Sequence, residues 1–206
     1  MYIFKKESDI VKIWNQSIVK NLKNSGLIKK TDNILDYGCG LGTWDNEASN
    51  NGIFFNKLYL YDKNSEIRGQ CKKNYPNHTV VNDINNELDV NLIFSNSVIQ
   101  YIEINDLKKL FERFNTMLKK DEMIIISDIP RYPRVLECIL TFFSNFDLFK
   151  TQVKQFLKPE YRKTDFYRHS IEDLETITKN HFRLTKIKNI SPNKNRVTLM
   201  FKKLNK

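Results

Sequence analysis

Three of the six glycines in this chain fall within five residues, at positions 38, 40 and 42. A largely apolar run over 33–36 ends in Asp36 just before them, and Thr43 and Trp44 follow. Glycine tolerates positive φ and lets a ligand come close to the backbone. The pattern therefore predicts a buried strand, a tight turn and a helix. In α/β sheets this unit binds nucleotide-like ligands at the carboxyl end of the strand.

The spacing of the glycines narrows the ligand class. A dinucleotide fingerprint, Gly-x-Gly-x-x-Gly, needs glycine or alanine at position 43, where this chain has Thr43. Asp36, two residues before the first glycine, would repel a pyrophosphate but suits a ligand that bears an ammonium and a sulfonium group. S-adenosylmethionine carries both charges. A nicotinamide oxidoreductase is the disfavoured alternative.

The chain resembles the class I S-adenosylmethionine-dependent methyltransferases, whose glycine motif reads Asp/Glu-x-Gly-x-Gly-x-Gly. The resemblance covers roughly residues 30–128. It implies a Rossmann-like, doubly wound α/β fold, with a mostly parallel seven-stranded sheet, an antiparallel last strand and helices on both faces. It also implies S-adenosylmethionine as cofactor and a small stand-alone enzyme of the small-molecule type. The implied cofactor-binding residues are Asp36, Gly38, Cys39, Gly40, Gly42, Asp62, Asp83, Ser95 and Asn96.

Two of these acids end predicted strands. Asp62 follows the apolar run 57–61 and lies 24 positions after Gly38. The resemblance implies that its two oxygens accept the ribose hydroxyl protons; the alternative is a strand-end turn aspartate. Asp83 ends the predicted strand 79–83, where the family places an acid or amide against the adenine amino group. Its alternative is to start a turn with the asparagines that follow.

A fourth strand, predicted over 90–95, leads into the region that lies beside the transferable methyl group in the family. This position implies cofactor contacts for Ser95 and Asn96 and substrate contacts for Gln100 and Tyr101. Methyl transfer is an in-line displacement at a sulfonium, so holding the reactants collinear is the main requirement. A general base is optional. For a hydroxyl acceptor the candidate catalytic residues are His169 and Asp128, the latter at the end of a fifth predicted strand.

Positive charge is concentrated in the last third of the chain. Residues 1–130 hold 17 Lys and Arg against 17 Asp and Glu, and residues 131–206 hold 17 against 7, which accounts for the net charge of +10. A basic surface attracts phosphorylated, carboxylated or nucleic-acid acceptors, although scattered lysines usually form a solvated face. We favour a small anionic or sugar-like acceptor, such as a cell-surface glycan precursor, bound by Arg131 and Arg168. An RNA methyltransferase and a non-catalytic binding protein of the same fold are the alternatives.

The remaining expectations concern the domain organisation, the cellular location and the metal content of the protein. We expect one domain over 1–206, with an N-terminal helix (1–30), a cofactor-binding core (31–128) and acceptor-side helices with a hairpin (129–206). No apolar stretch approaches the roughly 18–20 residues that span a bilayer, and no signal-peptide pattern opens the chain. The three widely spaced cysteines predict neither disulfides nor a metal site. We therefore expect a cytoplasmic, metal-free protein; the pattern does not indicate an oligomeric state.

The periodicity of apolar residues predicts strands alternating with helices and hence a parallel sheet. Besides the strands above, we expect a fifth strand over 122–128 and a hairpin of strands 184–190 and 196–201, with the last strand beside the fifth. The expected helices cover about 8–22, a short segment after the first strand that ends at about 50, 65–75, a long segment starting at an Asn105 N-cap, and a segment capped by Ser170 with Asp173.

Overall fold

The structure is a computed structural model that describes residues 9–130, 139, 142–143, 167, 169–188, 190–191 and 195–205. The predicted substrate residues Arg131 and Arg168 lie outside these ranges. The fold is therefore described for the cofactor-side core, the helix after His169 and the C-terminal hairpin.

A seven-stranded sheet forms the centre, with the strand order β3-β2-β1-β4-β5-β7-β6. The five strands from β3 to β5 run parallel, and β7 runs antiparallel between β5 and β6. This confirms the Rossmann-like sheet and the place of the last strand beside the fifth. The strands are β1 (Asn33–Tyr37), β2 (Lys57–Tyr61), β3 (Thr79–Val80), β4 (Leu92–Asn96), β5 (Met123–Pro130), β6 (Phe182–Lys188) and β7 (Arg196–Lys203).

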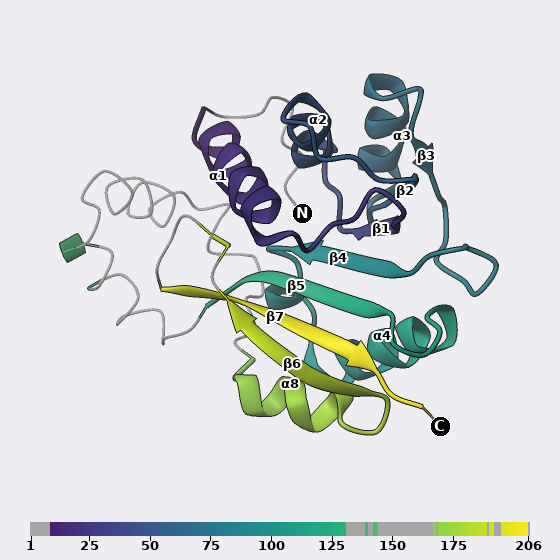
Figure 1. The fold of residues 1–206 in the computed structure, drawn as a ribbon, viewed down its shortest axis with the longest axis vertical. Helices are drawn as coiled ribbons and strands as arrows, with labels where there is room; N and C mark the ends of the chain where they lie inside the picture. Colours follow the sequence, from purple (N-terminus) through teal and green to yellow (C-terminus); the bar gives the residue numbers. More distant parts are fainter. Residues whose placement is uncertain are drawn as a thin grey trace.

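Helices cover both faces of the sheet, as predicted (Figure 1). One face carries α1 (Asp9–Ser25), α2 (Thr43–Asn50) and α3 (Ser65–Asn74). The other carries α4 (Ile104–Met117) and α8 (Ile171–Thr178), and a short 3₁₀ turn, η1 (Ile99–Tyr101), lies between β4 and α4.

The two faces bury different side chains. On the α4 face, the ring of Phe111 packs edge-on against Phe114, Phe182 and Phe201 in a wholly apolar layer. The face covered by α1, α2 and α3 also has an apolar core, but β1 and α2 place the buried carboxyl groups of Asp36 and Asp45 at the end of this core that lies beside the glycine-rich turn. These two buried carboxyl groups therefore lie under the glycine-rich turn.

Several element boundaries differ from the predicted ones. Helix α4 begins at Ile104 with Glu103 as its N-cap, so the prediction of Asn105 as N-cap is wrong. The Asn105 side chain donates to the Glu103 carboxylate at 3.0 Å and is not available to the helix backbone. The third strand stops at Val80 rather than position 83. The capping box of Ser170 and Asp173 is confirmed, with both reciprocal hydrogen bonds in place.

Candidate functional site

The glycine-rich turn between β1 and α2 takes positive φ at each of its three glycines, with values of 82°, 56° and 72°. Two of these glycines are needed for packing. A Cβ atom at Gly38 would lie 2.3 Å from Val98 Cγ2, and one at Gly42 would lie 3.0 Å from the Tyr75 ring. A Cβ at Gly40 would meet nothing within 4 Å. The turn therefore presents the backbone of Gly40 to open space, as a ligand cradle requires.

The end of β2 holds the turn in place. The backbone N–H groups of Gly38 and Cys39 both donate to the Tyr61 carbonyl, at 2.7 and 3.0 Å. Asp62, the next residue, accepts from the Gly40 N–H at 3.2 Å through Oδ2 and from the Asn64 N–H at 2.8 Å through Oδ1. The structure thus places the Asp62 carboxylate next to the accessible backbone of Gly40, where the ribose is predicted to bind.

Asp36 lies beneath the turn and is 1% exposed. Trp44, in the first turn of α2, donates its indole N–H to Asp36 Oδ2 at 2.8 Å. Burial raises the pKa of Asp36 to about 7, although the Trp44 bond and a hydrogen bond with the Asp45 carboxyl group act in the opposite direction.

Asp45 was not expected from the sequence, and it is 0% exposed. Burial, reinforced by the nearby carboxyl group of Asp36, raises its pKa well above the ordinary value. An acid in the first turn of a helix usually indicates a favourable charge near the exposed N-terminus. Helical spacing does contain a signal: position 45 lies three residues before the buried Ala48 and therefore shares its face.

Two cysteines also lie beside the turn. Cys39 and Cys71 are buried free thiols, and the Cys39 thiol donates to the Gly40 carbonyl at 3.6 Å. The neighbouring Cys71 thiol, with burial, raises the pKa of Cys39, while the Cys39 thiol lowers the pKa of Cys71. These contacts give Cys39 a packing role beneath the turn, and its predicted contact with the cofactor stays a prediction.

The end of β4 and the following η1 turn present two buried amide groups. Asn96 Oδ1 and Gln100 Oε1 are inaccessible and accept no hydrogen bond from the described residues. Ser95 instead donates its hydroxyl to the Tyr37 carbonyl at 3.0 Å, which ties β4 to β1. Buried oxygens without a donor are costly, so Asn96 and Gln100 are the groups in this region most in need of a ligand with N–H or O–H groups. Tyr101, by contrast, is 52% exposed.

His169 approaches the same turn from a distant part of the sequence. Its ring nitrogen Nε2 lies 2.8 Å from the Ile102 carbonyl oxygen. The Tyr167 ring stacks on it at 6.4 Å between centroids, and the Tyr167 N–H donates to the Gln100 carbonyl at 2.7 Å. Because a carbonyl only accepts, this contact assigns the proton to Nε2 and leaves Nδ1 as the basic nitrogen.

Asp128 occupies a bulge in β5, where the pairing with β7 shifts between Ile126 and Ile129. Its φ is 64°, and both of its carboxylate oxygens accept hydrogen bonds. Ser97 donates to Oδ2, and Ser191 donates to Oδ1 at 2.8 Å. The Arg196 guanidinium donates to the Asp128 carbonyl at 3.0 Å and lies 3.7 Å from Oδ2. These contacts favour a structural role for Asp128, and a catalytic role stays a prediction.

Sequence reasoning did not find the three partners of Asp128. Ser97 has a positive φ of 57°, which no sequence signal indicates for a serine. Ser191 and Arg196 lie 63 and 68 positions further along the chain. Only the pairing of β7 with β5 brings them near.

Asp83 lies at the periphery of this region. It is exposed and forms an ion pair with Arg113 of α4 at 2.8 Å. Hydrogen bonds from the Arg113 guanidinium and the Ile84 backbone lower the pKa of Asp83. A contact with adenine therefore requires Asp83 to share its carboxylate with Arg113, and the predicted role stays a prediction.

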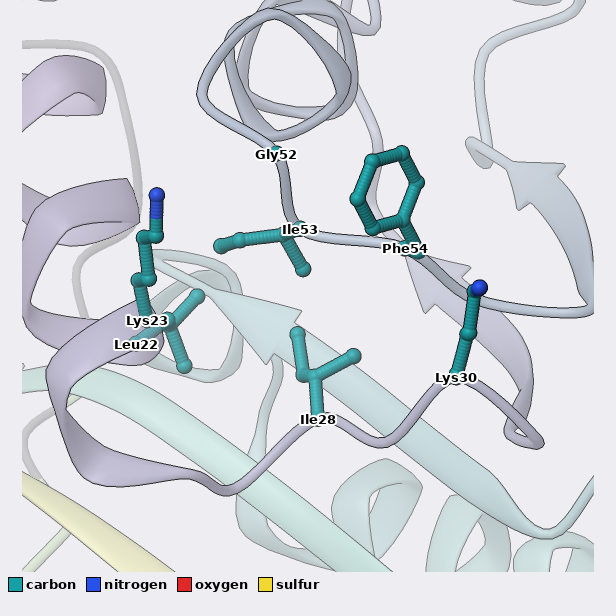
Figure 2. A pocket seen from close by; sticks show the side chains of 7 residues that line it. All are labelled: Leu22, Lys23, Ile28, Lys30, Gly52, Ile53 and Phe54. Carbon is teal, nitrogen blue, oxygen red and sulfur yellow. The ribbon is translucent and has the colours of Figure 1, made fainter.

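A shallow cavity of about 270 Å³ lies near the start of β1 and β2, at the opposite ends of these strands from the glycine-rich turn (Figure 2). Its walls come from the end of α1 and from the segments that precede β1 and β2. Lys23 and Lys30 flank its apolar floor, and the Lys30 ammonium lies 5.6 Å from the centroid of the Phe54 ring. The glycine turn follows β1, so this cavity is separate from the candidate site. It is lined by Leu22, Lys23, Ile28, Lys30, Gly52, Ile53 and Phe54.

Two further properties of the described residues bear on the surroundings of the site. No group of three or more His, Cys, Asp or Glu side chains there could hold a metal ion. Within the same residues, none of the helices combines the length and apolar character that crossing a bilayer requires.

Comparisons with known proteins agree with this geometry. The methyltransferase domain family matches residues 14–181. Among solved structures, a type 11 methyltransferase from Sulfolobus solfataricus is 20% identical, with a TM-score of 0.61 over 91% of this chain and 92% of that chain. Magnesium protoporphyrin IX methyltransferase from Synechocystis PCC 6803, with bound SAH, is 14% identical, with a TM-score of 0.61 over 97% and 89%.

A longer structure, the pyocyanin biosynthetic protein PhzM, is 10% identical, with a TM-score of 0.65 over 92% of this chain. The chain spans 55% of the length of that protein. None of the curated proteins that were compared matches the sequence. At these identities the structural likeness shows a common fold.

The family match covers most of the chain, and the chain therefore belongs to the methyltransferase domain family. It is a methyltransferase that uses S-adenosylmethionine.

Proposed function

We propose that the protein methylates a small-molecule acceptor at the carboxyl edge of the sheet. The observation that carries this proposal is the group of buried polar side chains after β4. Asn96 and Gln100 each offer an amide oxygen without a donor among the described residues, and His169 is fixed to the same turn through Ile102. Such a set suits an acceptor that presents O–H or N–H groups. The names of PhzM and the protoporphyrin methyltransferase refer to small molecules and support this class.

The predicted cofactor residues fit the methyl donor. The open space at Gly40 and the adjacent Asp62 carboxylate suit a nucleoside ribose with two hydroxyl donors. When bound, S-adenosylmethionine supplies an electrophilic methyl group on a sulfonium. We assign the cradle to the full predicted set: Asp36, Gly38, Cys39, Gly40, Gly42, Asp62, Asp83, Ser95 and Asn96.

For a hydroxyl acceptor we assign the proton transfer to His169. Its Nε2 proton is held by the Ile102 carbonyl, so Nδ1 is available to accept a proton from the acceptor. We assign acceptor contacts to Gln100 and Tyr101, because both lie in the η1 turn next to Ile102, whose carbonyl holds His169. We also assign acceptor contacts to Arg131 and Arg168 if the acceptor is anionic.

The acceptor class can be tested with methyl-labelled S-adenosylmethionine. The protein is incubated separately with the small-molecule fraction of a cell extract and with total RNA from the same cells. We expect label to enter the small-molecule fraction, and we expect Gln100→Leu and His169→Gln to lower incorporation at least tenfold. Both variants should bind adenosylhomocysteine within about twofold of the parent. Incorporation into RNA alone, or into neither fraction, would contradict the proposal.

The cofactor assignment can be tested separately through Asp62. Removing its carboxylate in Asp62→Ala should weaken adenosylhomocysteine binding by about 1.5–3 kcal/mol, the range for hydrogen bonds to charged groups. The matched control is Asp89→Ala, because Asp89 is exposed and pairs with Lys57, where β2 begins. Calorimetry that finds equal affinity for the two folded variants would show that Asp62 does not hold the ribose.

A further inference from the structure

The shallow cavity near the start of β1 and β2 combines an apolar floor with an exposed aromatic ring (Figure 2). Leu22 and Ile53 are the buried parts of the floor, and Ile28 beside them is half-buried. The Phe54 ring stands next to this floor and is 61% exposed. Contiguous apolar groups that are exposed and rimmed by polar residues mark interaction sites and ligand-binding grooves. The floor and the ring together suit the apolar body of a ligand.

Two lysine ammonium groups lie at the rim of this cavity, on opposite sides of the floor (Figure 2). Lys23 Nζ donates to the Asn51 carbonyl at 2.7 Å, and Lys30 Nζ lies 5.6 Å from the centroid of the Phe54 ring. Among the residues that the structure describes, no carboxylate forms an ion pair with either lysine. An ammonium group has three N–H donors, so Lys23 keeps donors for a ligand. The rim of the cavity therefore favours an anion.

Gly52 keeps the space between the Lys23 ammonium and the Phe54 ring free of side-chain atoms. Its φ is 74°, in the left-handed region that favours glycine. A Cβ atom at this position would lie 3.7 Å from Lys23 Nζ and 3.9 Å from Phe54 Cε2. A positive charge and an aromatic edge thus border the same open space, where a single small ligand contacts both.

We propose that this cavity binds a small carboxylic acid with an aromatic or branched apolar body. The carboxylate pairs with Lys23 over Gly52, the apolar body covers the floor and contacts the Phe54 ring, and Lys30 adds a second positive charge. The cavity of about 270 Å³ is slightly smaller than the roughly 300–1,000 Å³ of pockets for drug-sized ligands. It therefore suits one small acid and is too small for a dinucleotide.

This site is independent of methyl transfer in its position. The cavity borders the segments that precede β1 and β2, whereas the glycine-rich turn follows β1 and Asp62 follows β2. The acid therefore does not compete with S-adenosylmethionine, and its binding does not depend on which acceptor the enzyme methylates.

Titration of the whole protein with 4-phenylbutyrate at pH 7.5, followed by ¹H–¹⁵N NMR, tests this proposal. We expect saturable shifts of the Gly52, Ile53 and Phe54 amides with a dissociation constant below about 1 mM, and no shift at Gly40. Two matched probes separate the parts of the ligand: 4-phenylbutanol lacks the charge, and butyrate lacks the ring. Both should bind more weakly than the acid. Equal affinity for 4-phenylbutanol, or no saturable shift around Gly52, would overturn the proposal.

Variants of two exposed side chains assign the contacts. Lys23→Met keeps the apolar stem and removes the charge, and it should raise the dissociation constant of 4-phenylbutyrate about threefold or more, as loss of an exposed ion pair predicts. Phe54→Ala removes the ring and should raise it about fivefold or more. The matched control is Lys109→Met, because Lys109 is an exposed lysine of α4 on the other face of the sheet; it should bind like the parent.

All three variants should bind adenosylhomocysteine with the affinity of the parent, which shows that they are folded. Unchanged 4-phenylbutyrate binding in both Lys23→Met and Phe54→Ala would overturn the proposal, and so would an equal loss in Lys109→Met.

Discussion

Two buried aspartates near the carboxyl ends of β1 and β5 have opposite surroundings. Asp128 receives hydrogen bonds on both carboxylate oxygens and has the Arg196 guanidinium beside it. Asp36 receives one indole N–H and faces a second carboxyl group. Both are at most 5% exposed. Two buried aspartates at similar places on their strands therefore differ in the number of hydrogen-bond donors and in the charge of the groups that surround them.

The two aspartates therefore have different structural consequences at the carboxyl ends of the strands. The bonds of Asp128 connect β4, β5 and β7 and keep the turn after β4 in place. Asp36 and Asp45 are both buried, and within the described residues neither Asp45 oxygen receives a hydrogen bond, which is unfavourable for stability.

The largest expected effect is the loss of the Asp128 charge. Asp128→Asn tolerates the positive φ but removes the negative charge beside the Arg196 guanidinium and gives the Ser97 and Ser191 hydroxyls a poorer acceptor. Breaking a buried ion pair costs about 3–5 kcal/mol, so we expect the free energy of unfolding to fall by about that much. Urea denaturation at pH 7.5 measures it. A loss below about 1 kcal/mol would contradict the difference drawn between the two aspartates.

Removing the carboxyl group of Asp45 should have the opposite effect and raise the free energy of unfolding. Burial raises the pKa of Asp36 to about 7 and also raises the pKa of Asp45. A raised carboxyl pKa costs no stability below about pH 4, where both folded and unfolded chains are protonated. The cost grows as pH rises toward 7, because only the unfolded chain ionises freely. We therefore expect Asp45→Asn to stabilise the protein by about 1–3 kcal/mol at pH 8.

Denaturation of this variant at two pH values sharpens the test. The gain in the free energy of unfolding should be largest at pH 8 and clearly smaller at pH 4.5, and it should vanish only below about pH 4. A gain that is equal at both values would show that the introduced amide merely packs better and that the carboxyl pair carries no ionisation cost.

The smallest effect on stability is expected for the exposed Asp83. Asp83 is exposed, and its ion pair with Arg113 is of the exposed kind that contributes little. Asp83→Asn should change the melting temperature by less than about 2 °C. Scanning calorimetry without ligand measures this value. A larger decrease would mean that Arg113 fastens β3 to α4 more firmly than its exposure indicates.

Local patterns were enough to predict the glycine turn, its flanking strand and the position of Asp62. Each depends on residues close together in the sequence, and the parallel order of the strands follows from their alternation with helices. The partners of Asp128 could not be predicted, because Ser191 and Arg196 reach it only through the antiparallel pairing of β7. Asp45 was also missed, since a first-turn acid usually interacts with the helix dipole in solvent.

The prediction of strand 79–83 shows a further limit of local patterns. Apolar periodicity continued the third strand to Asp83, but the structure ends it at Val80 and directs Asp83 toward Arg113 of α4. The strand lies at the edge of the sheet, so few neighbouring strands hold its end.

The position of β7 between β5 and β6 has a consequence during synthesis. Strand β5 ends at Pro130, and β7, which covers its free edge, begins 66 residues later at Arg196. At about 5–20 residues per second, a ribosome exposes the edge of Met-Ile-Ile-Ile-Ser for several seconds before its partner strand is made. An apolar, strongly β-forming edge of this kind can pair with other chains. The nascent protein is therefore expected to depend on chaperones until the strand that completes the sheet has left the ribosome.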